Sequence, residues 1–216
     1  MKNLKDFLFA WFAEFRSARA VQVTIALTCV ITFIQVIGDT NPNIGVHSAL
    51  RVTATAFADG EFWRPLTANF VHLAKIPHLM LNMVGLALAG PFVERDYGSL
   101  RFIILYLLPG YVAWSVRSIL GKSGSGASAA LVGVFAALLV SSIARYSDSS
   151  RARRLVVLAI LLSTAWLLGG FLIDDRRILP FIEPVNIAND VHVVGFVVGL
   201  LLGCIVLPRQ SAQRQF

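Results

Sequence analysis

Long stretches without any Asp, Glu, Lys or Arg divide this sequence, and they restrict the possible fold more than any other feature. The first stretch, Val21–Ile37, has 17 uncharged residues, and five others of similar character follow it. About 20 consecutive apolar residues are enough for a helix to cross a bilayer, whereas a soluble core has no use for repeated runs of this kind. Charged residues make up only 14% of the chain, against roughly a quarter in soluble domains. The sequence therefore predicts an all-α membrane protein with several spans.

Six membrane-spanning helices are expected within one membrane domain, residues 21–207, which a short tail, 208–216, follows. The apolar runs that define the spans are Val21–Ile37, Pro77–Val93, the run between Arg101 and Arg117, Gly126–Ala144, Leu155–Ile173 and Val191–Leu207. The segment between the first two runs carries charges and scattered aromatic residues, so we expect it to fold outside the hydrocarbon layer.

Residues 1–20 differ from the spans, because apolar residues recur there at helical spacing among several basic residues. The apolar positions are Leu4, Phe7, Leu8, Trp11, Phe12 and Phe15. A helix with one apolar and one charged face lies in the plane of a membrane surface. We predict an amphipathic N-terminal segment of this kind.

The distribution of basic residues predicts the orientation and the partner. With the N-terminus inside, 12 of the 19 Lys and Arg residues fall in the cytoplasmic segments 1–20, 94–101, 145–154 and 208–216. Basic residues concentrate on the cytoplasmic side of membrane proteins, so both termini are expected in the cytoplasm. Because the basic residues lie in short segments between apolar runs, the net charge of +7 indicates the lipid bilayer as partner and no nucleic acid.

Four polar residues are predicted to lie at one depth near the external face. In this orientation the even-numbered spans begin outside; His78 and Asn82 start the second, Ser128 the fourth and His192 the sixth. His78 and Asn82 are four residues apart, about 6 Å along a helix, and share one face. A single polar side chain in a span can simply join helices by hydrogen bonds. Four on one level, from three helices, favour a functional site.

The chemistry that these residues support is acyl transfer. A serine hydroxyl needs a base, and a histidine can take its proton and return it to a leaving amine, which Ser128 and His192 could do. Donors for the oxyanion could come from His78, Asn82 and the Ser128 backbone N–H at a helix start. Asp190 lies two residues before His192 and therefore points to another helix face, so we predict a dyad without it.

A metal site is the competing use of the histidines. His72 and His78 are six residues apart, which is neither of the helical ligand spacings, and the spans contain no carboxylate beside them. We therefore expect no metal.

Small residues recur every four positions on two spans. Gly195, Gly199 and Gly203 form one stripe, and Ala129 with Gly133 forms the other. Such stripes let helices approach closely, either as ordinary bundle packing or to bring Ser128 and His192 together.

The order and spacing of these pieces resemble the rhomboid family of intramembrane serine proteases. The resemblance runs from about Glu61 to Gly199 and rests on Glu61-Phe62-Trp63-Arg64, His78 and Asn82, Glu94 with Gly98, Gly126-Ala127-Ser128, and His192 with Gly195 and Gly199.

The resemblance implies a six-helix bundle in which Ser128 and His192 form the dyad, while His78, Asn82 and Gly126 serve the oxyanion and substrate. It also implies structural roles for Trp63, Arg64, Glu94, Gly98, Gly195 and Gly199, the first two in a half-submerged external loop. Single-span membrane proteins would be the substrates, cut near the external face without a cofactor. The lack of an evident transit peptide favours a bacterial inner membrane.

Two departures from the family pattern are Ala129, where a glycine usually follows the nucleophile, and Val132, where many members carry an aromatic residue against the catalytic histidine. The alternative function is an inactive rhomboid-like protein that binds or escorts membrane clients. A small-molecule transporter would need a polar path across several spans, whereas the polar residues here stop at one face.

Overall fold

The computed structural model describes residues 4–39, 45–72, 75–144, 157–158 and 188–206, and helices dominate this part of the chain. The helices are α1 (Leu4–Ser17), α2 (Arg19–Gly38), α3 (Val46–Leu50), α4 (Ala54–Ala58), α5 (Arg64–Thr67), α6 (Lys75–Tyr97), α7 (Ser99–Ile119), α8 (Ser128–Ala144) and α10 (Asn189–Val206).

Four helices, α2, α6, α7 and α10, are long and apolar enough to cross a membrane, and α8 is an apolar helix of 17 residues. They coincide with five of the six predicted spans, and the all-α prediction is confirmed for the described residues. The remaining predicted span, Leu155–Ile173, lies outside them except for residues 157–158. The count of six spans and the cytoplasmic side of the termini stay predictions.

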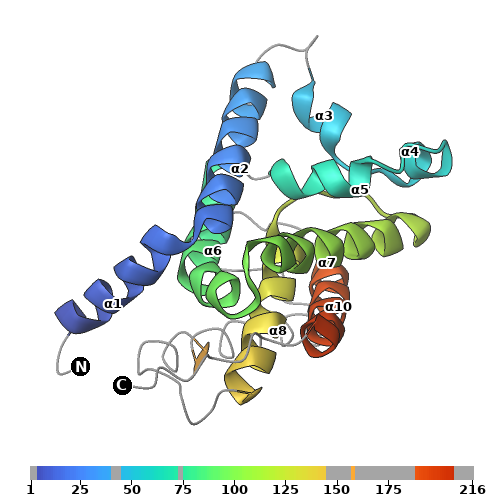
Figure 1. The fold of residues 1–216 in the computed structure, drawn as a ribbon. Coiled ribbons are helices and arrows are strands. Elements are labelled where there is room, and N and C mark those ends of the chain that lie inside the picture. Colours follow the sequence, from blue (N-terminus) through green and yellow to red (C-terminus); the bar gives the residue numbers. More distant parts are fainter. Residues whose placement is uncertain (1–3, 40–44, 73–74, 145–156, 159–187, 207–216) are drawn as a thin grey trace.

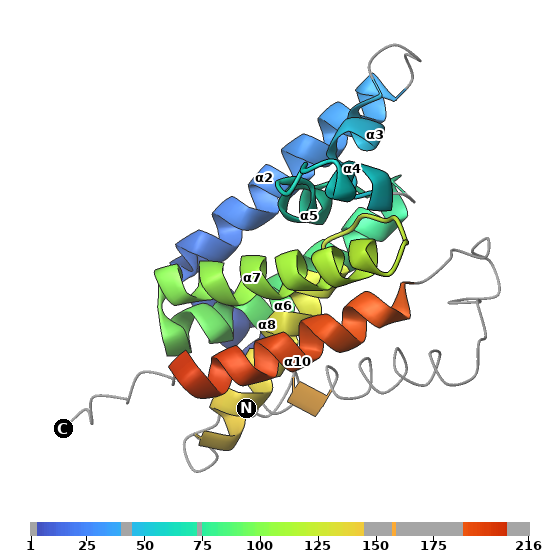
Figure 2. The ribbon, with the colours of Figure 1, turned by 90° about the vertical axis from the view of Figure 1, so that its right-hand side faces the viewer.

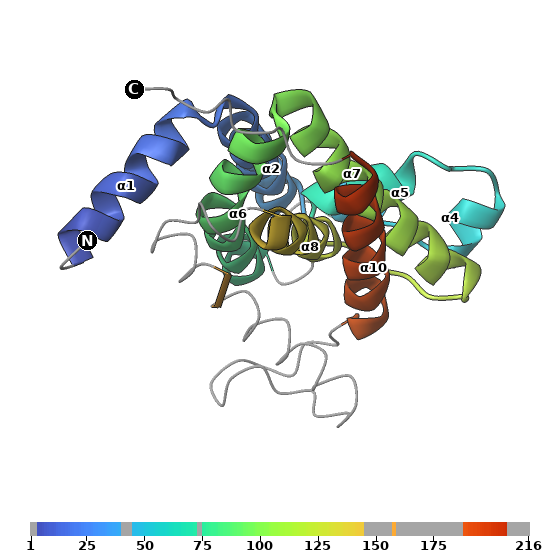
Figure 3. The same cartoon turned by 60° about the horizontal axis from the view of Figure 1, so that its bottom comes forward.

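Helix α8 lies at the centre of the bundle. All ten residues from Ala129 to Leu138 are buried, and a helix that is apolar on every side belongs in the interior. Helices α6, α7 and α10 pack around it (Figure 3). Because Ser128 is the first residue of α8, this packing places it where three other helices can supply partners.

Glu94 and Gly98 join α6 to α2 and α7. The Glu94 carboxylate accepts the backbone N–H groups of Ala20 at 3.0 Å and Val21 at 2.9 Å. N–H groups in the first turn of a helix have no partner within it, and the helix dipole favours negative charge there. The Ser99 hydroxyl also donates to Glu94, at 2.7 Å. Gly98, just before α7, has a φ of +88°, a backbone conformation that glycine tolerates best. These two motif residues therefore hold three helices together.

Helix α1 packs against α6 and completes its hydrogen bonding. Pro91 lies inside α6 and has no N–H for the Ala87 carbonyl one turn earlier. The Trp11 indole donates to that carbonyl at 3.0 Å. An unpaired carbonyl in a membrane costs several kcal/mol, so this contact is a strong reason for α1 to dock here. An ion pair between Glu14 and Arg95 adds a second attachment.

The outer face of α1 stays apolar and uncovered. Its exposed residues include Leu8, Phe9 and Phe12. The predicted N-terminal helix is present, and its contact with a membrane surface stays a prediction.

The residues between α2 and α6 that the structure describes, 45–72, are called the external region below, after the side of the membrane that the sequence predicts for them. Its short helices α3, α4 and α5 lie together on one side of α7 (Figures 1 and 2). Within it, Val52 exchanges two backbone hydrogen bonds with Gly124, at 3.1 and 3.0 Å. The external region is therefore in direct contact with the residues that precede Ser128.

Candidate active site

Ser128 and His192 lie within hydrogen-bond distance. His192 Nε2 is 2.8 Å from Ser128 Oγ. His192 lies in the first turn of α10, and Ser128 is the first residue of α8. Ser128 is partly accessible, whereas His192 is buried with 6% of its surface exposed. If the hydrogen of the imidazole is on Nδ1, the serine hydroxyl donates to Nε2, which is the arrangement that a general base needs.

The α8–α10 seam, defined by Gly195 and Gly199 against Ala129 and Gly133, brings this pair together. A Cβ on Gly195 would lie 2.3 Å from the Ala129 carbonyl oxygen, and one on Gly199 would lie 2.4 Å from that of Gly133. The two backbones are thus in contact, which no larger residue at positions 195 or 199 would allow without movement. The structure agrees with the contact expected from the two small-residue stripes. Ala129 fits in the seam because its backbone, rather than its methyl group, meets Gly195.

Asp190 does not approach the free nitrogen of His192. It forms an ion pair with Arg117, at the end of α7, and lies 3.7 Å from the Lys122 ammonium. Within the described residues, the buried Nδ1 of His192 has no hydrogen-bond partner. Within the described part of the chain the geometry is therefore that of a Ser/His pair without a carboxylate on the second histidine nitrogen.

Gly126 lies beside His78 at the entrance to α8. Its φ of +133° disfavours other residues, and a Cβ there would lie 2.7 Å from the His78 ring. Its N–H donates to the Ala68 carbonyl at 2.8 Å, and its own carbonyl accepts the Trp114 indole at 3.3 Å. A glycine is required here because the backbone must pass directly against the imidazole.

Asn82 is buried and bonded to its own helix. Its amide donates to the His78 carbonyl at 3.0 Å, one turn earlier on α6. An amide nitrogen carries two hydrogens, so this bond uses only one of them. His78 itself has a buried Nδ1 without a hydrogen-bond partner in the described part of the chain. Both residues lie on α6; Asn82 keeps one amide hydrogen, and one ring nitrogen of His78 is left as a donor or an acceptor according to the tautomer.

His72 is a site residue that sequence reasoning treated only as a possible metal ligand. It is fully buried, its Nε2 accepts the Ala127 N–H at 3.4 Å, and its ring meets that of His78 edge-on at 5.0 Å. Its Nδ1 lies 3.0 Å from the Thr32 hydroxyl, which donates to the Phe70 carbonyl at 3.1 Å. This chain of bonds assigns the hydrogen of His72 to Nδ1.

Burial, together with the neighbouring His78 and His47, lowers the pKa of His72 to about 3. The residue is therefore neutral near pH 7 and supports the backbone just before Ser128. The sequence feature that could have indicated this role is the pair of polar residues, Thr32 and Gln35, inside the first span, because buried polar side chains need hydrogen-bond partners. Gln35 also bonds the backbone of His72, at 2.9 Å in each direction.

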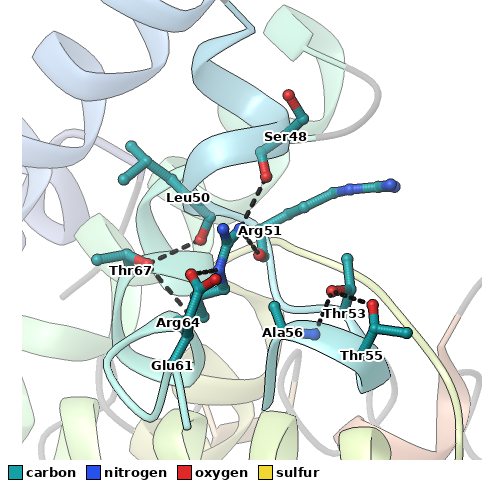
Figure 4. Close-up of polar contacts among 9 residues, drawn as sticks. All are labelled: Ser48, Leu50, Arg51, Thr53, Thr55, Ala56, Glu61, Arg64 and Thr67. Carbon is teal, nitrogen blue, oxygen red and sulfur yellow. Dashed lines mark hydrogen bonds and ion pairs between the residues drawn. The ribbon is translucent and has the colours of Figure 1, made fainter. Parts of the chain in front are cut away.

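Arg64 holds the external region together. Its guanidinium donates to the carbonyls of Ser48 at 2.8 Å and Arg51 at 3.1 Å, and it forms an ion pair with Glu61 (Figure 4). The neighbouring Trp63 is 55% exposed. Arg64 therefore fixes the backbone on both sides of the end of α3, whereas Trp63 presents an aromatic ring outward.

Among the residues that the structure describes, His, Cys, Asp and Glu side chains form no group of three or more that could hold a metal ion. The absence of a metal in the whole protein stays a prediction.

Comparison with known proteins identifies similar chains in plants and bacteria. The Rhomboid domain family matches residues 59–209. RHOMBOID-like protein 4 of Arabidopsis thaliana is 29% identical over 152 residues, which cover 69% of this chain and 35% of that protein. Rhomboid protease GluP of Bacillus subtilis (strain 168) is 31% identical over 159 residues, 72% of this chain and 28% of the relative. Inactive RHOMBOID-like protein 8 of Arabidopsis thaliana is 30% identical over 134 residues, 60% of this chain and 34% of the relative. The chain thus spans about a third of the length of these relatives.

Proposed function

Because this chain belongs to the rhomboid family, we propose that it is an intramembrane serine protease that cleaves transmembrane segments of single-span membrane proteins. The observation that carries the proposal is the 2.8 Å contact between Ser128 Oγ and His192 Nε2 in a bundle of apolar helices. The name of the GluP relative includes protease activity, which supports the same reaction.

The proposed reaction begins when His192 Nε2 takes the hydroxyl proton of Ser128 and Oγ attacks the scissile carbonyl carbon. The tetrahedral intermediate collapses as the imidazolium returns the proton to the leaving amine and the C–N bond breaks. Water, deprotonated by the same imidazole, then attacks the acyl–serine ester and releases the carboxyl product and Ser128. No group outside the chain, the substrate and water is required.

Three donors are available for the oxyanion of the intermediate. The Ser128 N–H lies in the first turn of α8, where N–H groups have no intrahelical acceptor. The second amide hydrogen of Asn82 and the ring of His78, which flanks Gly126, are the other two. Donors fixed before the reaction stabilise developing charge most effectively.

The protein is a multi-pass membrane protein, and we further propose that its dyad faces the external side of a bacterial plasma membrane. The division of Lys and Arg supports the orientation. The relatives named above are one bacterial protein and two plant proteins, and the bacterial one, GluP, is the ground for proposing a bacterial membrane. A cysteine at Ser123 should react with an impermeant maleimide from outside whole cells, and one at Ser99 should not; the reverse pattern would place the dyad on the inner face.

An inactive membrane-client binder is the second candidate, because one relative is named inactive. The deciding experiment is labelling of the detergent-solubilised protein with a fluorophosphonate, together with cleavage of a reporter that has one transmembrane segment. We expect labelling and cleavage in the wild type and neither in Ser128→Ala or His192→Ala. A wild-type protein that is folded but shows neither would favour the binder.

A further inference from the structure

Residues 124–127, called the nucleophile loop here, are attached to the external region at each of their four positions. Gly124 pairs with the backbone of Val52, and the Gly126 N–H donates to the Ala68 carbonyl at 2.8 Å. Between them, Ser125 Oγ lies 2.8 Å from His47 Nε2. The Ala127 N–H donates to His72 Nε2 at 3.4 Å. Of these four contacts, the one between Ser125 and His47 joins two side chains, so it needs a particular residue both in the loop and in the external region.

His47 is held in a defined place before it reaches the loop. It lies on α3, and its backbone N–H donates to the Asp39 carboxylate, at the end of α2, at 3.1 Å. Arg64 fixes the carbonyl of Ser48, the next residue after His47, and that of Arg51, at the end of α3 (Figure 4). The imidazole is therefore presented from a rigid support, which is the condition for one side chain to position another.

The position of Ser125 matters because its neighbours touch the reacting groups. Gly126 packs so closely on His78 that a methyl group would not fit, and Ser128 follows two residues later. A shift of the loop would therefore change both the oxyanion side and the start of α8. Misplacement of catalytic groups by about 1 Å can cost on the order of 10²-fold in rate.

We propose that His47 is a positioning residue for Ser128, acting through its hydrogen bond to Ser125. This inference rests on the proposed protease function. It assigns no proton transfer to His47: the imidazole holds the nucleophile loop against the external region and leaves the chemistry to Ser128 and His192. The bond contributes to the rate by keeping Ser128 aligned, and it has no direct contact with the substrate.

Ser125 and His47 also form a second serine–histidine pair, and the test must separate positioning from a second nucleophile. Ser125 is 8% exposed, whereas Ser128 is partly accessible at the start of its helix. Mass-spectrometric mapping of the fluorophosphonate adduct in the full-length wild type is therefore expected to find it on Ser128 alone. An adduct on Ser125 would overturn the positioning role.

The main experiment compares four variants of the full chain: His47→Ala, Ser125→Ala, the double variant, and His47→Gln, whose amide can bond the Ser125 hydroxyl. A matched control is Ser48→Ala, which removes a hydroxyl on the same helix that bonds only to Gly45 in the described contacts. We expect His47→Ala and Ser125→Ala to lower kcat by about tenfold each with KM within about twofold, because the attachments of Gly124, Gly126 and Ala127 remain. The double variant should be no slower than either single one, and His47→Gln should recover most of the rate.

Amide hydrogen exchange of the peptide that covers the nucleophile loop gives a readout that does not need activity. Exchange should rise in His47→Ala and Ser125→Ala and stay unchanged in Ser48→Ala and His47→Gln. Unchanged exchange in His47→Ala would overturn this inference whether or not the protein is a protease. A folded wild type without Ser128-dependent labelling would instead overturn the proposed function, while the exchange result would still decide the role of His47.

Discussion

The two sides of the candidate site are built by different forces. On one side, the α8–α10 seam places Ser128 beside His192 through backbone contact. The contact is so close that a Cβ added to Gly195 would lie 2.3 Å from the Ala129 carbonyl oxygen. On the other side, the nucleophile loop is held by the hydrogen bond between Ser125 and His47 and by that from the Ala127 N–H to His72. Close packing leaves no tolerance for an added atom, whereas a set of hydrogen bonds loses its members one at a time. A single substitution in the seam should therefore remove most of the activity, whereas the loss of one hydrogen bond at the loop should lower the activity only in part.

The most severe test of this difference is a methyl group in the seam. In Gly199→Ala the Cβ would lie 2.4 Å from a backbone oxygen, so the helices must separate and the 2.8 Å contact of the dyad is lost. We expect cleavage of a single-span reporter to fall by about 10²-fold or more, with a lower melting temperature. Gly203→Ala is the matched control, because its nearest neighbours would be 3.3 Å away and turnover should stay near wild type. Normal turnover in Gly199→Ala would show that the seam does not determine the distance between Ser128 and His192.

On the hydrogen-bonded side, Asn82→Ala should lower turnover by no more than about 10²-fold, because one donor of several is removed from the oxyanion site. His78→Ala should behave similarly. The rate on the reporter and the melting temperature must be measured together. Asn82 also bonds the His78 carbonyl, so complete loss of activity together with a much lower melting temperature would show that Asn82 stabilises the fold instead.

Acid should weaken the hydrogen-bonded side through His72. Its folded-state pKa of about 3 lies below its ordinary value of 6.5, so between these values the unfolded chain binds a proton that the folded chain does not. Stability from this group is therefore complete above about pH 6.5 and is lost as the pH falls toward 3. The fall in melting temperature on acidification should be smaller in His72→Gln than in the wild type. An identical fall in both proteins would show that His72 is not held neutral.

The smallest expected effect is at Val132, which is buried in α8 one turn after Ser128. If an aromatic ring there supports the catalytic histidine, Val132→Phe should raise turnover by a few-fold, while overpacking costs about 1–3 kcal/mol of stability. Turnover and melting temperature are again read together. A stable Val132→Phe protein without a faster rate would mean that another residue, such as Phe196 or Phe135, already orients His192.

Periodic and local features made much of this arrangement predictable. The spans, the small-residue stripes and the level shared by Ser128, His192 and His78 all follow from helix geometry and membrane thickness, which repeat along the chain. Asp190 could be excluded for the same reason, since residues two apart on a helix diverge. The structural role of Glu94 was expected only from the family resemblance, and the structure supplies its cause as the cap of α2.

The sequence by itself determined that this chain is a bundle of apolar helices with a serine and a histidine at the same end, because hydrophobic periodicity acts on each helix separately. Only the tertiary structure decided which partners hold the nucleophile loop. His47 meets Ser125 across 78 residues of sequence, and His72 meets Ala127 across 55. Such single polar contacts leave no periodic trace in a sequence, and they form because helix packing brings their distant segments together.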